Sequence, residues 1–152
     1  MDSGSTDIKN IVLADDDLDD CMLFKDAIQE LSVKTNLTIT HDGTELMSTL
    51  DQTVPPSPHV IFLDLNMPLK NGFECLNEIR QTDKLKSIPV VVFSTSSSQD
   101  IVDKTYKLGA NCYVTKPSTY PLLIKAIETA LFSTLIGKSD QPSRDKFCLA
   151  IN

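Results

Sequence analysis

Residues 60–68 read VIFLDLNMP, and this stretch decides the fold class. Four consecutive large apolar residues run directly into Asp64, and Pro68 closes the segment four positions later. A short uninterrupted apolar run is typical of a strand that is buried on both faces. A carboxylate at the end of such a strand loses its solvation unless it is paired. The stretch therefore predicts a buried strand whose terminal carboxylate meets charged groups from elsewhere in the chain.

Strand-like runs and helix-like patterns alternate five times along the 152 residues. The expected strands cover residues 11–14, 37–40, 60–64, 89–93 and 112–115, and the last expected helix covers 119–136. Strands that alternate with crossover helices imply a parallel sheet with helices on both faces. We therefore expect one α/β domain over residues 8–136. Residues 1–7 and 137–152 are expected to be flexible termini, with the apolar residues 147–151 as a docking patch.

Composition and charge exclude several classes of protein. The formal net charge is −7, from 21 acidic and 14 basic residues, which repels nucleic acid and anionic membranes. No apolar run approaches the roughly 20 residues that a membrane-spanning helix needs. The 4 cysteines are widely spaced and form no CxxC pair, which favours a reduced protein over a disulfide framework. We expect a cytoplasmic protein that binds neither nucleic acid nor a membrane.

Polar and charged side chains follow four of the five expected strands. The first strand ends at Asp15 and Asp16, the third at Asp64, the fourth at Ser94 and the fifth at Lys116. The carboxyl ends of parallel strands meet at one edge of the sheet, where ligands bind. Clustered carboxylates need a cation, and oxygen ligands without His or Cys suit Mg²⁺. An aspartate beside Mg²⁺ can attack phosphorus, while a lysine and a hydroxyl bind the phosphoryl oxygens.

Each part of this cluster has a simpler interpretation when it is taken alone. The acidic run 15–20 is typical of a helix N-terminus, and Asp17 is expected to be its N-cap. The serine-rich run 94–98 is typical of a loop, and Lys116 before a proline is typical of a solvated turn. The convergence of all these parts at one edge favours a functional site.

The order, spacing and type of these residues resemble the receiver domain of bacterial two-component response regulators, the CheY-like family. The resemblance covers about residues 8–136. It implies a flavodoxin-like (βα)5 three-layer sandwich, with a five-stranded parallel sheet in the order 2-1-3-4-5. It also implies a stand-alone bacterial response regulator in phosphorelay signal transduction, and not an enzyme, that accepts a phosphoryl group from a sensor histidine kinase.

The resemblance assigns roles to the acidic residues and to the loop after the third strand. Asp64 resembles the phosphoacceptor of the family. Asp15 and Asp16 resemble the acidic pair that holds Mg²⁺ together with Asp64, and Asn66 would offer its backbone carbonyl to the metal. Gly72 matches the loop that follows.

The resemblance also implies a switch. Ser94 takes the place of the switch hydroxyl, and Lys116 resembles the lysine that binds the phosphoryl group. Tyr113, three residues before that lysine, resembles the aromatic switch residue. The new charge on Asp64 would attract Ser94 and Lys116, and Tyr113 would then fill the space vacated beside the Ser94 loop.

The sequence suggests partners but leaves their identity open. The loop PPSP at residues 55–58 and the stand-alone architecture resemble small regulators that partner phytochrome-type or hybrid kinases. The apolar arc of the last helix is wider than one sheet contact needs, because it extends beyond the core stripe to Ile124, Phe132, Leu135 and Ile136. Either the C-terminal tail covers this arc, or a partner or a second copy of the chain docks there.

Three rival functions share parts of the pattern. A haloacid-dehalogenase-type phosphatase also uses an aspartate at a strand end, but it needs a second aspartate two residues later, where this chain has Asn66. A pseudo-receiver adaptor never takes a phosphoryl group, and the intact set of acidic residues, hydroxyl and lysine argues against it. A flavodoxin would not carry DDDLDD at residues 15–20 as its phosphate-binding loop.

Overall fold

The computed structural model describes residues 7–52, 57–136 and 141–151. Its elements are β1 (Lys9–Ala14), α1 (Leu18–Gln29), β2 (Thr35–Thr40), α2 (Gly43–Gln52), β3 (Val60–Leu63), α3 (Gly72–Gln81), β4 (Val90–Ser94), α4 (Gln99–Lys107), β5 (Cys112–Thr115), α5 (Tyr120–Ile136) and α6 (Arg144–Phe147). The five strands are parallel and lie in the order β2-β1-β3-β4-β5. The fold class expected from the sequence is confirmed.

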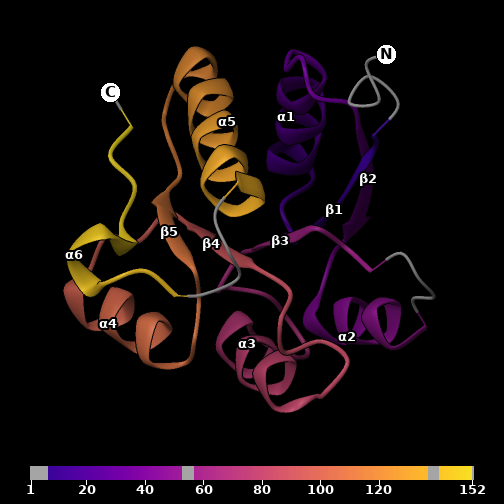
Figure 1. Ribbon diagram of the computed structural model, residues 1–152, viewed down its shortest axis with the longest axis vertical. Helices are drawn as coiled ribbons and strands as arrows, with labels where there is room; N and C mark the ends of the chain where they lie inside the picture. The colour runs from indigo at the N-terminus through magenta and orange to yellow at the C-terminus, as the bar shows by residue number, and fades with distance from the viewer. Residues whose placement is uncertain (1–6, 53–56, 137–140, 152) are drawn as a thin grey trace.

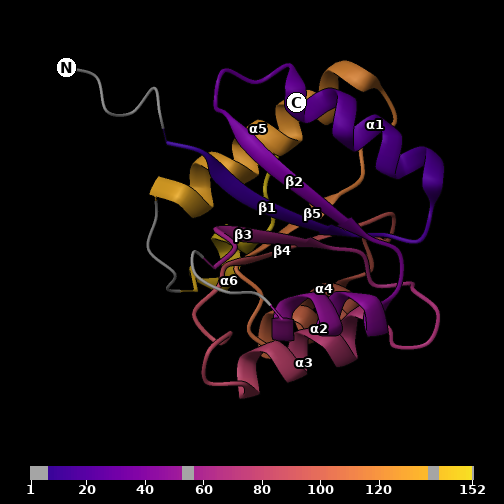
Figure 2. The same ribbon diagram turned by 90° about the vertical axis from the view of Figure 1, so that its right-hand side faces the viewer.

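The sheet lies between two helical layers, as Figure 1 and, turned by 90°, Figure 2 show. Helices α1 and α5 cover one face, and α2, α3 and α4 cover the other. Because successive side chains of a strand point to opposite faces, β3 serves both layers. Ile61 and Leu63 join the cluster under α2, α3 and α4, while Val60 and Phe62 join the cluster under α1 and α5. The continuous apolar run of β3 is therefore fully buried.

An aromatic cluster fixes α1 on its face of the sheet. The ring of Phe24 meets those of Phe62 and Phe93 edge to face, with ring centroids 5.0 and 6.0 Å apart. This geometry is one that aromatic pairs prefer. The cluster fixes the position of α1, whose first turn carries Asp19 and Asp20, the end of the acidic run.

The start of α3 is set by a capping box just after the loop that carries Asp64. The side chain of Asn71 accepts a hydrogen bond from the backbone N–H of Glu74, and the Glu74 carboxylate accepts one from the backbone N–H of Asn71, both at 2.9 Å. These bonds satisfy donors that a helix start leaves unpaired.

Replacement of Asn71 by Ala is expected to lower the free energy of unfolding by about 1 kcal/mol, because it removes this cap. Urea denaturation followed by circular dichroism measures the effect. Asn77→Ala, at an exposed position of the same helix, is the matched control and is expected to change stability by less than about 0.5 kcal/mol. Equal losses in the two variants would show that the cap is not the cause.

The expected core stripe of α5 is confirmed, and part of its wider apolar arc is partly buried. The stripe consists of Leu123, Ile127, Ala130 and Leu131, all of them buried. Leu149 and Ile151 from the C-terminal segment pack against the same hydrophobic cluster. Ile124 and Leu135 of the wider arc pack against this cluster too, and cover of the arc by the tail stays a prediction.

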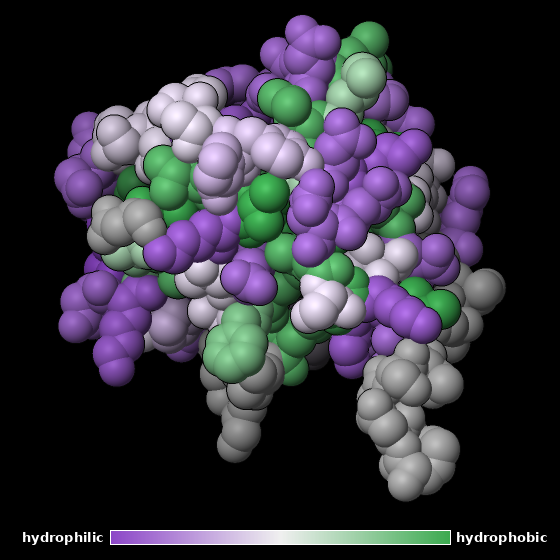
Figure 3. Space-filling view, turned by 90° about the horizontal axis from the view of Figure 1, so that it is seen from above, coloured by the Kyte–Doolittle hydropathy of each residue, from purple (hydrophilic) through white to green (hydrophobic). Residues whose placement is uncertain are grey.

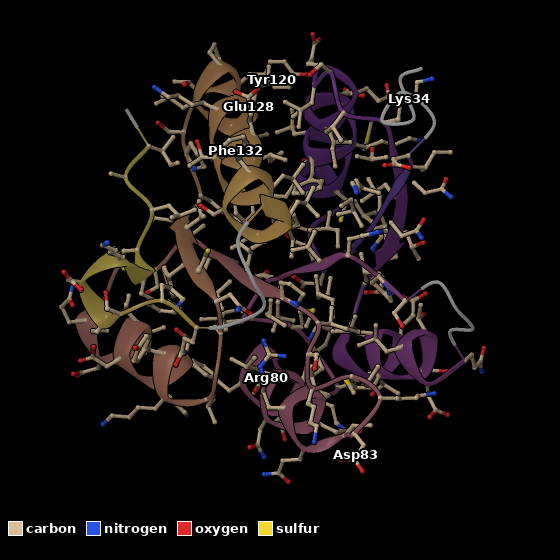
Figure 4. The ribbon with its side chains drawn as sticks, in the orientation of Figure 1. Lys34, Arg80, Asp83, Tyr120, Glu128 and Phe132 are labelled. Atoms are coloured by element: carbon tan, nitrogen blue, oxygen red, sulfur yellow. The ribbon has the colours of Figure 1, made fainter. Side chains whose placement is uncertain are left out.

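Another part of the α5 arc stays open. Phe132 is 66% exposed and lines a groove with Leu31, Val33 and Leu135. Figure 3 shows apolar side chains in the middle of the α1 and α5 face with polar ones around them, and Figure 4 shows Phe132 on α5. The side chain of Ile136 lies outside the described residues. Docking of a partner or of a second copy on α5 stays a prediction.

The sequence predicts a flexible terminus at residues 141–151, but this segment is folded onto the domain. They form the short helix α6 and a segment that pairs with the edge of β5. The physical reason is Phe147, whose side chain is 0% exposed inside the cluster under α4. Residues 1–6, 137–140 and 152, also assigned to flexible termini, lie outside the described part of the chain. No helix among the described residues is long and apolar enough to cross a membrane.

Candidate functional site

The sheet brings together the residues that follow β1, β3 and β5. The backbone N–H of Asp64 donates to the carbonyl of Ala14 at 2.9 Å, which continues the pairing of β3 with β1. The N–H of Lys116 donates to the carbonyl of Ser94 at 2.8 Å, which continues the pairing of β5 with β4. The strands thus deliver Asp15, Asp64 and Lys116 to one edge, as the sequence predicts.

Lys116 lies at the centre of the site. Its Nζ atom is 2.7 Å from Asp15 Oδ2, 2.9 Å from Asp20 Oδ2 and 3.8 Å from Asp64 Oδ2. The side chains of Asp15 and Lys116 are 2% and 10% exposed, so this ion pair is screened little by solvent, whereas the side chain of Asp20 is 38% exposed. One ammonium group therefore balances carboxylates from three different segments of the chain.

Three carboxylates form a group that can hold a metal ion. Asp15, Asp16 and Asp64 each offer an oxygen atom, and these atoms all lie within 4.8 Å of one another. Asp16 is exposed, whereas Asp15 and Asp64 are buried. The group contains oxygen ligands alone and is open on the side of Asp16, which suits a hard divalent cation that keeps several waters.

Neither histidine belongs to this group. His59 Nδ1 accepts a hydrogen bond from the backbone N–H of Asn10 at 2.9 Å. The backbone N–H of His41 bonds to Glu45 at the start of α2. The absence of His from the acidic group agrees with the expectation of an oxygen-only site.

Burial and charge act in opposite directions on Asp64. Burial raises the pKa of its carboxyl to about 6, helped by the nearby Asp15 charge and opposed by Lys116. The backbone N–H groups of Leu65 and Asn66 hydrogen-bond to the carboxylate and also lower the pKa. For Lys116, burial lowers the pKa, but hydrogen bonds to Asp15 and Asp20 outweigh it, and the net shift is upward. The charged Lys116 thus faces the Asp64 carboxyl, whose ionised form is destabilised by its burial.

Ser94 and Tyr113 meet on the loop after β4. Ser94 is 0% exposed, and its Oγ atom accepts a hydrogen bond from the backbone N–H of Ser96 at 3.2 Å. Tyr113 is 1% exposed, and its hydroxyl donates to the carbonyl oxygen of Ser96 at 2.7 Å. The two predicted switch residues therefore hold the same loop residue from two sides.

Comparisons with known proteins show the family of this chain. A family model of the response regulator receiver domain matches residues 11–128, which include all of the strands' carboxyl-terminal edge. The chain belongs to the response regulator receiver family. Response regulator Rcp1 of Synechocystis sp. is 38% identical to it over 132 residues, which are 84% of this chain and 90% of Rcp1.

Solved receiver structures superpose on most of this receiver domain. The phosphorylated cyanobacterial phytochrome response regulator RcpA does so with a TM-score of 0.78 at 35% identity, over 85% of this chain and 95% of RcpA. The Mn²⁺-bound form of response regulator Rcp1 gives a TM-score of 0.73 at 36% identity, over 89% of this chain and 99% of that one. The family expected from the sequence is confirmed.

Sequence reasoning missed one member of the site in this receiver domain. The sequence predicts Asp20 as part of an acidic helix start, and its N–H does donate to the N-cap Asp17 Oδ1 at 3.0 Å. Its carboxylate, however, reaches Lys116 at 2.9 Å. The position of Asp20 in the sequence could have identified it. The first turn of α1 follows shortly after Asp15, so a carboxylate there lies near the edge of the sheet that carries Lys116.

Gly72 is required by the backbone that carries Asp64. A Cβ atom at this position would lie 2.4 Å from the carbonyl oxygen of Asp64 and 2.7 Å from the Cα atom of Leu65. Both are backbone atoms, which cannot move without shifting the phosphoacceptor candidate. The start of α3 thus packs directly against the loop after β3.

Proposed function

We propose that this receiver accepts a phosphoryl group on Asp64, with Mg²⁺ bound at the adjacent acidic group, and so switches a partner-binding surface in a phosphorelay. The observation that carries the proposal is the buried Asp64 carboxylate beside both an acidic group and a charged lysine. Membership of the receiver family is by itself also compatible with an adaptor that never takes a phosphoryl group. The arrangement of Asp64 beside the acidic group and Lys116 favours phosphoryl transfer instead.

Asp15, Asp16 and Asp64 would hold the Mg²⁺ ion, with the backbone carbonyl of Asn66 as a further ligand. The metal would neutralise charge on the phosphoryl oxygens as phosphorus passes from the donor to Asp64. The Mn²⁺-bound form of the relative Rcp1 supports a divalent cation in this family. The choice of Mg²⁺ rests on the oxygen-only ligands.

Side chains of the protein would carry out the transfer, bind the phosphoryl group and pass on the switch. Asp64 Oδ attacks phosphorus and forms the acyl phosphate, and the phosphorus–nitrogen bond to the donor's phosphohistidine breaks. Lys116 already lies 3.8 Å from Asp64 Oδ2 and would bind a phosphoryl oxygen. Ser94 would donate its hydroxyl to another, and the movement of its loop would pass to Tyr113 through Ser96. The protein is in this proposal a signalling component rather than an enzyme.

A phytochrome-type sensor histidine kinase is the proposed donor. The relative RcpA is described as a phytochrome response regulator, and its chain is matched over 95% of its length. Relatives at 38% and 35% identity support the class of partner, not one particular kinase. The expected cytoplasmic location and bacterial origin stay predictions.

The test is phosphate incorporation from acetyl phosphate. Wild type is expected to take up alkali-labile phosphate with Mg²⁺ and not with EDTA, and Asp64→Asn is expected to lose the labelling. Asp83→Asn, on a side chain that is 99% exposed, is the matched control and should label like wild type. Absence of labelling in wild type, or equal labelling in Asp64→Asn, would favour a phosphorylation-independent adaptor.

A further inference from the structure

Residues 141–151, here called the C-terminal arm, are fastened along α4 and the outer edge of β5 (Figure 1). The hydroxyl of Tyr106 donates to the carbonyl oxygen of Pro142 at 2.8 Å. The guanidinium of Arg144 donates to Asp103 Oδ1 at 2.8 Å. Specific contacts along α4 therefore position the arm before it reaches β5.

The arm holds Tyr113 by its ring and by its backbone. The ring centroid of Phe147 lies 6.2 Å from that of Tyr113 and 5.0 Å from that of Tyr106, and Phe147 is 0% exposed. One residue further, Cys148 forms a parallel bridge with Tyr113, and the N–H of Leu149 donates to the Tyr113 carbonyl at 3.0 Å. The arm thus fixes both the main chain and the side chain of this residue.

Tyr113 connects the arm to the candidate phosphoryl site. Its hydroxyl bonds to the Ser96 carbonyl, and the Ser96 N–H bonds to Ser94 Oγ. The carbonyl of Ser94 accepts the backbone N–H of Lys116 at 2.8 Å. Phe147 is therefore joined to the loop of Ser94 by a short, continuous series of contacts.

We propose that Phe147 is a positioning residue that acts through Tyr113, so that docking of the arm favours the state with a phosphoryl group on Asp64. The inference rests on the proposed function. A docked arm restricts Tyr113, and Tyr113 restricts the loop that must present the Ser94 hydroxyl. The loop of Ser94 is then already restricted before the phosphoryl group arrives, so it loses less conformational entropy when the group binds. Coupling of binding is reciprocal, so the phosphoryl group should in turn tighten the arm.

A purely structural arm is the simpler alternative. It would cover the open edge of β5 and add apolar burial, which are ordinary uses of a C-terminal segment. In that case Phe147→Ala would lower the free energy of unfolding and leave the affinity of the folded protein for a phosphoryl analogue unchanged. The two interpretations therefore differ in affinity, not in stability.

The experiment uses beryllofluoride as the phosphoryl analogue, with the full chain in excess Mg²⁺. The half-saturating concentration is followed by ¹⁹F NMR at a temperature where circular dichroism shows every variant folded. Phe147→Ala is expected to bind about fivefold more weakly than wild type. Phe147→Leu, which keeps apolar volume against Tyr113, should recover most of the affinity. Met22→Ala removes an exposed apolar side chain from α1 and is the matched control, with wild-type affinity expected.

Two further readouts keep the proposal open to refutation. Leu149→Pro removes the N–H that donates to the Tyr113 carbonyl and should also weaken the binding of beryllofluoride. This variant tests the proposal if Phe147→Ala does not fold. In wild type, beryllofluoride should slow hydrogen exchange at the Leu149 amide. Unchanged or tighter binding in folded Phe147→Ala would overturn the inference and leave the proposed function standing. If wild type itself does not bind beryllofluoride, the proposed function fails, and this inference fails with it.

Discussion

Lys116→Met is expected to lower the free energy of unfolding of the metal-free protein by about 3–5 kcal/mol at neutral pH. The Lys116 ammonium contacts Asp15, Asp20 and Asp64, and two of these carboxylates are almost fully buried. A methionine fills similar space without charge. Asp15 and Asp64 then stay close together in a poorly solvated place with no cation, and removal of one partner from a buried charge network is costly for this reason.

Urea unfolding in EDTA measures this loss. Lys25→Met, at an exposed position of α1, is the matched control and should change stability by less than about 0.5 kcal/mol. Added Mg²⁺ should restore more stability to Lys116→Met than to wild type, because in the variant the metal is the only cation at the acidic group. Metal-free Lys116→Met that is as stable as wild type would show that Lys116 does not balance these carboxylates.

Sequence patterns predicted the sheet well because its strands have few alternatives. The run at β3 and the run VVVF at residues 90–93 are too short and too apolar for surface helices, and each lies buried on both faces. The sequence marks residues 147–151 as an apolar patch, but residues 141–146 are polar and nothing local indicates where the patch docks. Phe147 is buried through contacts with Tyr106 and Tyr113, which lie far away in the sequence. No periodicity within residues 141–151 contains that information.

The candidate site was predictable where strand ends determine it. Asp15, Asp64 and Lys116 follow strands directly, so the order of the parallel sheet places them at one edge. Asp20 was not predicted as a partner of Lys116, because helix capping already accounts for an acid at a helix start. Whether the Asp20 side chain serves the helix start or reaches Lys116 depends on the orientation of α1 on the sheet. The packing of Phe24 fixes that orientation.

Asp64→Asn is expected to have the opposite effect to Lys116→Met and to stabilise the metal-free protein by about 2–3 kcal/mol near neutral pH. Burial raises the pKa of Asp64 from 3.8 to about 6 in the folded protein, with Asp15 also raising it and Lys116 lowering it. A folded-state pKa above the unfolded value means that the folded protein binds the proton more tightly. The stability contributed by this proton is complete below about pH 4 and is lost as the pH rises through about 6. Asparagine has no charge to desolvate and avoids that loss.

The pH dependence separates this cause from others. Urea unfolding of wild type and Asp64→Asn in EDTA, between about pH 4 and pH 7.5, should show curves that are close at the acidic end and diverge as Asp64 ionises. Asp83→Asn, at the exposed position seen in Figure 4, should follow wild type throughout. Excess Mg²⁺ should narrow the gap at neutral pH, because the ion stabilises the ionised Asp64 of wild type and finds one carboxylate fewer in the variant. A constant difference at every pH would mean that asparagine acts through packing, and the account of Asp64 as a buried carboxylate held ready for a cation would then be wrong.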